Sequence, residues 1–157
     1  MNLGKIKDAA CSATIFAENF LQIINDTCNK YQITTPIRQL CLLAQEGPES
    51  GGLYYTEEFA SIVAYEGRKT LGNTLIQVTG SANYKRIGDA LGVDFIKEPT
   101  FLGSKNVKTS TQDQLKYAVL SAGWFWNSRN INAPADKINI HSPIDIVLIL
   151  KILMQSL

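Results

Sequence analysis

The chain has 157 residues, 45% of them hydrophobic, and a formal net charge of +1. This length suits one domain, and the apolar content excludes a disordered chain because it is enough for a buried core. Without a long run of one charge sign, strong electrostatic capture of nucleic acid or anionic lipid is disfavoured. We therefore expect a single domain over residues 1–157 with a neutral or weakly charged ligand.

The three cysteines, Cys11, Cys28 and Cys41, form no C-x-x-C pair. Their odd number, spread through expected helices, disfavours a disulfide framework and a zinc site. Each is predicted to be a small buried hydrophobe, and we expect neither a metal nor another cofactor. Residues 1–8 lack the apolar run of a signal peptide, and the apolar stretch 144–153 is too short to cross a bilayer. The sequence thus predicts synthesis in the cytoplasm without stable membrane insertion.

The first half of the chain predicts two amphipathic helices. Within residues 13–30, apolar residues recur at helical spacing; the stripe is Phe16, Phe20, Ile23 and Thr27. Thr35 and Pro36 then suit the cap and first position of a helix reaching Gln45, which the pair Gly47-Pro48 ends or bends. The expected buried face of this second helix is Ile37, Leu40, Cys41 and Ala44.

The second half returns to helix after an irregular stretch. Residues 50–80 contain several glycine breakers, with short helical pieces expected near 57–65 and an extended piece near 75–78. A helix over residues 81–91 is stopped by Gly92. The next helix is capped by Thr109, Ser110 or Thr111 and buries Leu115, Ala118, Val119, Ala122 and Trp126. Residues 130–143 are expected to be loop and 144–153 a terminal helix. The predicted class is mostly α.

Two glutamates near the irregular segment could perform acid–base chemistry. Glu49 follows a helix end, and Glu58 lies nine residues later, beyond Gly51-Gly52. Hydrolysis of a glycosidic bond requires one protonated and one ionised carboxyl group on either side of the bond. The glycines allow the chain to fold back so that both could line one cleft, although such pairs also arise by chance among 14 acidic residues.

Six stretches of the sequence, two of which contain these glutamates, match the pattern of a known protein family. Leu42–Gly52, with its Glu-Ser-Gly-Gly motif, resembles the family 19 glycoside hydrolases, which are chitinases and related phage endolysins. The other matching stretches follow in the family's order within residues 35–136: Tyr55–Glu58, Ala64–Arg68, Leu71–Thr74, Leu75–Tyr84 and Ala122–Trp126. The resemblance implies a lysozyme-like helical domain with a cleft and at most a short β element. It also implies cleavage of a β-1,4 link, with inversion, in peptidoglycan or chitin.

The resemblance assigns roles to individual residues. Glu49 matches the general acid, and Glu58 matches the base that polarises water, with Glu57 as the alternative because the register of this pair is ambiguous. The motif Gln-x-Thr…Asn gives sugar and water contacts at Gln77, Thr79 and Asn83, whose amides and hydroxyl suit a neutral sugar. Tyr54, Tyr55 and Tyr84 could offer flat faces to sugar rings or pack in the core. Other expectations are a substrate contact at Arg68, a mainly buried aromatic cluster Trp124–Trp126 with one tryptophan at the cleft, and no role for His141.

The sequence also departs from the family pattern. Pro48 stands where many relatives have histidine, and Thr74 runs directly into Leu75 where the family usually has a Gly- and Arg-rich segment. A catalytically impaired prophage relative that still binds saccharide is therefore the alternative to an active enzyme. Residues 83–93 superficially resemble part of a helix-turn-helix, but the near-neutral charge disfavours a nucleic-acid partner. The absence of a signal peptide suits an endolysin that reaches the cell wall through a holin, and peptidoglycan is preferred to chitin.

Overall fold

The computed structural model describes residues 18–56, 75–76, 78–104 and 106–138. Residues 18–30 are helical, and the elements that follow are α2 (Pro36–Glu49), α3 (Ser81–Leu91), the 3-10 turn η2 (Pro99–Leu102), α4 (Gln112–Ser128) and α5 (Asn132–Ala135). Over these ranges, β structure is limited to isolated bridges such as the antiparallel pair Tyr55 and Asn106. The expected mostly α class is confirmed and is consistent with a lysozyme-like domain. A single domain over residues 1–157 stays a prediction.

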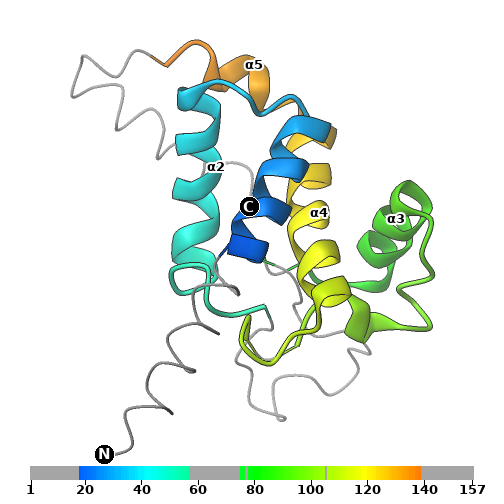
Figure 1. Ribbon diagram of the computed structural model, residues 1–157. Helices are drawn as coiled ribbons and strands as arrows, with labels where there is room; N and C mark the ends of the chain where they lie inside the picture. Colours follow the sequence, from blue (N-terminus) through cyan, green and yellow to red (C-terminus); the bar gives the residue numbers. More distant parts are fainter. Residues whose placement is uncertain (1–17, 57–74, 77, 105, 139–157) are drawn as a thin grey trace, which may run out of the picture.

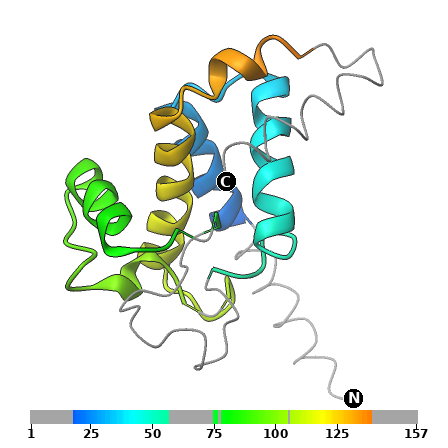
Figure 2. The ribbon, with the colours of Figure 1, turned by 180° about the vertical axis from the view of Figure 1, so that it is seen from behind.

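The helices pack around two groups of buried side chains. The helical residues 18–30 lie between α2 and α4, and α3 lies on the opposite side of α4 from α2 (Figures 1 and 2). The first group joins residues 18–30, α2, the end of α4 and α5, with Cys28, Cys41, Leu42, Trp126 and Ile131 among its members. The second group lies under α3, with Val78, Tyr84, Ile87, Phe95 and Leu102. The start of α2 therefore lies beside α5 and the end of α4, and α3 packs on the other side of α4.

Helix α2 begins as predicted but ends later. The Thr35 hydroxyl accepts a hydrogen bond from the Arg38 backbone N–H, and Pro36 occupies the first turn. The sequence predicted that Gly47-Pro48 would end or bend the helix after Gln45; the pair does not end it, because α2 continues through Pro48 to Glu49. A proline disfavours helical backbone at the preceding residue through a steric conflict with that residue's N–H and Cβ, and Gly47, which has no Cβ, removes part of this conflict. The last turn of α2 is therefore compatible with its proline.

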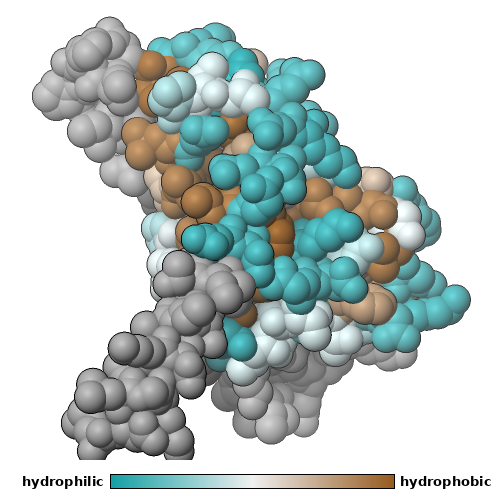
Figure 3. Space-filling view, viewed as in Figure 1, coloured by the Kyte–Doolittle hydropathy of each residue, from teal (hydrophilic) through white to brown (hydrophobic). Residues whose placement is uncertain are grey.

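The buried face of α2 also differs from the expected stripe. Leu40, expected in the core, is 50% exposed, whereas Leu42 is only 3% exposed. Towards its C-terminal end the helix buries two polar side chains, Gln45 and Glu46, which lie one turn after Leu42 on the same face. Figure 3 shows apolar surface along α2, the helix that exposes Leu40 and Leu43.

The predictions for α3 and α4 are confirmed. Helix α3 spans Ser81–Leu91 and ends at Gly92, whose left-handed φ of 73° suits a residue without a side chain. Of the three candidate caps, Thr111 begins α4 and forms a capping box with Gln114. All five residues of the predicted stripe are buried: Leu115, Ala118, Val119, Ala122 and Trp126.

Two loop predictions need correction, and others cannot be compared. Residues 130–143 were expected to be loop, but α5 forms one helical turn there. Of the extended piece expected near 75–78, Leu75 and Ile76 form a turn, whereas Val78 lies in a β-bridge. The expected helical pieces near 57–65 and 144–153 lie outside the described residues. Cys28 and Cys41 are buried free thiols, as predicted, and Cys11 lies outside these ranges. No helix within the described ranges has the length and apolarity needed to span a bilayer.

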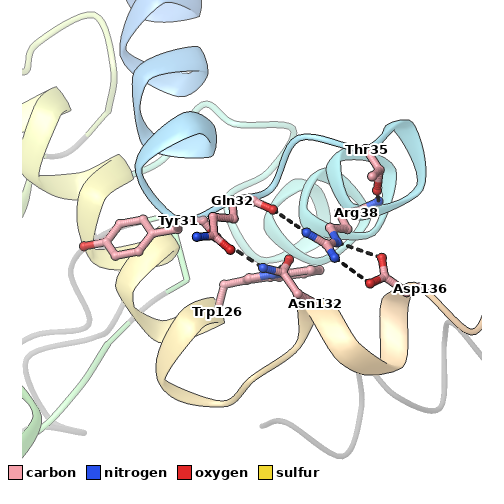
Figure 4. Close-up of polar contacts among 7 residues, drawn as sticks. All are labelled: Tyr31, Gln32, Thr35, Arg38, Trp126, Asn132 and Asp136. Carbon is pink, nitrogen blue, oxygen red and sulfur yellow. Dashed lines mark hydrogen bonds and ion pairs between the residues drawn. The ribbon is translucent and has the colours of Figure 1, made fainter.

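A polar cluster fastens α5 to the start of α2 (Figure 4). The Arg38 guanidinium donates to both carboxylate oxygens of Asp136, at 2.7 and 2.5 Å, and to the Gln32 backbone oxygen at 2.6 Å. The buried Trp126 indole N–H donates to Asn132 Oδ1 at 2.8 Å, and the Asn132 amide donates to the Tyr31 backbone oxygen. Because the Arg38 guanidinium, the Asp136 carboxylate and the Trp126 indole are all paired, the chain around α5 has a defined position although it forms a single helical turn.

Gly123 allows α4 to lie directly against the helix of residues 18–30. A Cβ at this position would lie 2.4 Å from Tyr31 Cδ2 and 2.5 Å from Thr27 Cγ2, both on side chains of the facing segment. Thr27 is only 1% exposed, so it has little room to move. We expect Gly123→Ala to lower the free energy of unfolding by about 1–3 kcal/mol through overpacking.

Equilibrium urea denaturation would measure this change. Asn127→Ala is the control, because Asn127 is an exposed residue of the same helix. Alanine has a higher helix propensity than asparagine, so this control should leave the free energy of unfolding unchanged or raise it by less than about 1 kcal/mol. Equal stability of the two variants would show that the helices do not meet closely at Gly123.

Candidate active site

A buried serine fixes the end of α2, where the predicted general acid lies. The Ser50 hydroxyl donates to the Glu46 backbone oxygen at 2.6 Å and accepts from the Leu53 N–H at 2.7 Å. The Ser50 N–H also donates to the Glu46 oxygen, and the Ser50 oxygen accepts from the N–H groups of Tyr54 and Tyr55. These bonds satisfy backbone groups that a helix end leaves open. Glu49 therefore projects from a constrained turn.

Residues from three helices and the segment before α3 line a pocket of about 180 Å³. Its described lining comes from α2, the segment before α3, α3 itself and the end of α4: Gln45, Glu49, Ile76, Val78, Thr79, Asn83, Arg86, Trp124, Phe125, Ser128 and Arg129. Three residues predicted from the sequence, Glu49, Thr79 and Asn83, thus meet at one pocket. Its volume is below the ~300–1,000 Å³ of sites that enclose a drug-sized ligand, so a polymer would extend beyond it.

The environment of Glu49 favours its protonated form. Partial burial raises the pKa of the Glu49 carboxyl from 4.5 to about 6. Desolvation has this effect because it disfavours the charged carboxylate more than the neutral acid. A carboxyl group with a pKa near the working pH can hold a proton and also release it, as a general acid must.

Polar groups that can contact a sugar lie across the pocket from α2. The Asn83 side-chain amide donates to the Thr79 backbone oxygen at 3.0 Å, which orients Asn83 at the start of α3. The Thr79 and Asn83 side chains can both donate and accept hydrogen bonds. Of the two tryptophans, Trp124 lines the pocket and Trp126 is 1% exposed in the core. The wall therefore combines an aromatic surface with neutral polar groups.

The remaining predicted site residues are not part of this described lining. Tyr55 lies next to the turn after α2, where a Cβ on Gly51 would be 2.7 Å from its ring, and its ring meets Tyr54 edge-on at 4.8 Å. Tyr84 is fully buried under α3, so the core role applies to it. Glu57, Glu58, Arg68, Gln77 and His141 lie outside the described residues, and the distance between the two proposed catalytic carboxyls stays untested.

Sequence reasoning missed a second acid beside Glu49. Glu46 lies one turn earlier in α2 and is 1% exposed. Neither of its carboxylate oxygens, nor Nε2 of the adjacent Gln45, has a hydrogen-bond partner in the described part of the chain. Burial, and then the nearby Glu49 charge, raise the pKa of Glu46 to about 8. No signal in the sequence indicated it, because the expected apolar stripe of α2 did not pass through Leu42, Gln45 and Glu46.

Sequence reasoning also missed two cations in the pocket wall. Arg86 lies in α3 one turn after Asn83, and its guanidinium carbon is 5.8 Å from the Trp124 ring centroid. Arg129 caps the end of α4 and lies 4.8 Å from the Phe125 ring centroid. The spacing of Asn83 and Arg86 could have indicated a shared helix face. Nothing in the sequence marked Arg129.

Comparison with known proteins adds a relationship over part of the chain. No family model matches the sequence. Over 93 residues, the chain is 30% identical to the acidic 27 kDa endochitinase of Solanum lycopersicum. The chain is similar to a plant endochitinase. The matched region covers 59% of this chain, which spans only 32% of the relative's length.

Proposed function

We propose that the protein hydrolyses β-1,4 glycosidic bonds in a polysaccharide of N-acetylated amino sugars, either peptidoglycan or chitin. The observation that carries the proposal is Glu49, a half-buried acid with a pKa of about 6, in a pocket shared with Thr79 and Asn83. The similarity to a protein named endochitinase supports the same general chemistry. The residues at the pocket suit a neutral sugar ring with amide and hydroxyl substituents.

In the proposed reaction Glu49 gives its proton to the oxygen of the departing sugar. A second carboxylate, Glu58 or alternatively Glu57, would remove a proton from water as the water attacks the anomeric carbon from the opposite face. Thr79 and Asn83, with Gln77, would hold the water and the sugar substituents. The products are one new reducing end and one new non-reducing end, with inversion at the attacked carbon.

The proposed biological setting is that of an endolysin within glycoside hydrolase family 19. The protein would be made in the cytoplasm and reach peptidoglycan after release through a holin or a similar pore. The motifs Glu-Ser-Gly-Gly and Gln-Val-Thr-Gly-Ser-Ala-Asn support this assignment. The catalytically impaired relative remains the second candidate, because Pro48 replaces the family's usual histidine and the segment expected before Leu75 is missing.

The direct test offers the purified full chain two substrates of matched length, peptidoglycan glycan strands and chitohexaose. We expect new reducing ends by colorimetric assay, and NMR during the first turnovers should show the inverted anomer. Turbidity of outer-membrane-permeabilised bacteria would report lysis in parallel. Saccharide binding without any new reducing end would support the impaired relative and contradict the enzyme. Retention of anomeric configuration would contradict the two-carboxylate inverting mechanism.

A further inference from the structure

We infer that Arg86 and Arg129 make the pocket select saccharides that carry a carboxylate, and so favour peptidoglycan glycan over neutral chitin. The inference rests on the proposed glycan hydrolysis and goes further by naming the residues that discriminate between its two substrates. The observation behind it is that two guanidinium groups from different helices line the same pocket as Glu49.

Both arginines lie near aromatic rings, and no hydrogen bond joins either side chain to another residue in the described part of the chain. The guanidinium of Arg86 lies over Trp124 and that of Arg129 over Phe125, and all four residues line the pocket. Cation–π contact restricts where the guanidinium lies but leaves its N–H groups directed outward at its edges. Each of these two exposed arginines thus lies near an aromatic ring of the pocket wall and keeps its N–H donors available to a ligand.

The charges around the pocket leave these arginines without a protein counterion among the described residues. The ion pairs there join Arg38 to Asp136, Lys85 to Asp89 and Lys97 to Asp94. Glu49 is the sole acidic residue in the described pocket lining, against two arginines. Even with Glu49 ionised, this lining carries a net positive charge, which attracts an anionic group on the ligand.

The shape of the guanidinium group indicates which anion would bind. Arginine donates two parallel N–H bonds to a carboxylate, a geometry that a hydroxyl or acetamido group cannot match. Alternate sugars of peptidoglycan bear a lactyl group that ends in a carboxylate or in an acidic peptide, whereas every sugar of chitin is neutral. A chain of alternating neutral and acidic sugars would thus place its neutral amide groups at Thr79 and Asn83 and an acidic group at the arginines.

The test compares glycan strands freed of peptide by an amidase, which expose the lactyl carboxylate, with chitohexaose. The double variant Arg86→Gln/Arg129→Gln should lose at least about tenfold in kcat/KM on the carboxylated strands and less than about twofold on chitohexaose. The matched control is Lys85→Gln/Lys116→Gln, which removes the same charge from α3 and α4 outside the pocket. The control should keep the wild-type selectivity.

Binding provides a readout that does not depend on catalysis. Calorimetric titration of both saccharides into Glu49→Gln protein, with and without the two arginine substitutions, should show the same selective loss. Added salt should weaken the binding of the carboxylated strands more than that of chitohexaose. If the wild-type protein hydrolyses neither saccharide, the proposed function fails and the titration still decides the arginine role. Equal losses on both saccharides, or unchanged selectivity of the double arginine variant, would overturn the inference.

Discussion

Replacing Glu49 with glutamine is expected to lower kcat for glycan hydrolysis by about 10²–10⁴-fold, the usual contribution of a general acid. Glutamine has nearly the same shape but cannot supply a proton, so the departing oxygen would leave as an unprotonated anion. The side chain lies at the end of α2, and its backbone is held by the Ser50 turn. The substitution should therefore leave the fold and saccharide binding intact.

Steady-state release of reducing ends, with KM or binding measured separately, checks this result. Glu98→Gln serves as the control because Glu98 is an exposed acid outside the pocket. Activity should also fall as the pH rises through about 6, where the carboxyl of Glu49 loses its proton. A Glu49→Gln protein that retains half of the wild-type rate would end the role of Glu49 as the acid.

Removal of the Glu46 carboxyl should stabilise the protein at neutral pH. The carboxyl has a pKa of about 8 in the folded protein against an ordinary value of 4.5. Between these pH values the unfolded chain releases this proton and the folded chain keeps it. Stability therefore falls as the pH rises from about 4.5 to about 8, by at most about 1.4 kcal/mol per pH unit for one group. The loss becomes complete above the folded pKa.

Two variants separate the charge from the shape of this buried group. Glu46→Gln should flatten the pH dependence of the free energy of unfolding between pH 5 and 8. Glu46→Leu should do the same and should also raise stability at pH 7 by roughly several kcal/mol, because it removes buried polar atoms without partners. Urea denaturation at a series of pH values measures both effects, with exposed Glu98→Gln as the control. If the free energy of unfolding of Glu46→Gln fell with pH as steeply as that of the wild type, the pH dependence would belong to another group.

Local signals in the sequence predicted the elements that local interactions determine. The bounds of α3 follow from its apolar spacing and from Gly92, and the start of α4 follows from the Thr111 cap. The end of α2 was mispredicted because Gly47 offsets the usual effect of Pro48. The exposure of Leu40 could not be foreseen, since it depends on Gln45 and Glu46 being buried by other parts of the chain.

The residues of the candidate site likewise divide into those that the sequence predicted and those that only the structure revealed. Glu49, Thr79 and Asn83 were found through motif resemblance, and they meet at one pocket although 30 residues separate Glu49 from Thr79. Arg86 and Arg129 were missed because only tertiary packing reveals that α3 and the end of α4 converge. An isolated arginine on a helix normally indicates a solvated surface, and no local pattern distinguishes it from one that faces a ligand.

The position of Glu49 as the last residue of α2 has an electrostatic consequence. The aligned peptide dipoles of a helix place a partial negative charge at its carboxyl end. That partial charge repels a carboxylate, so the backbone of α2 acts in the same direction as burial and helps Glu49 to retain its proton. At the opposite end of such a helix, the same dipoles would instead favour the ionised carboxylate.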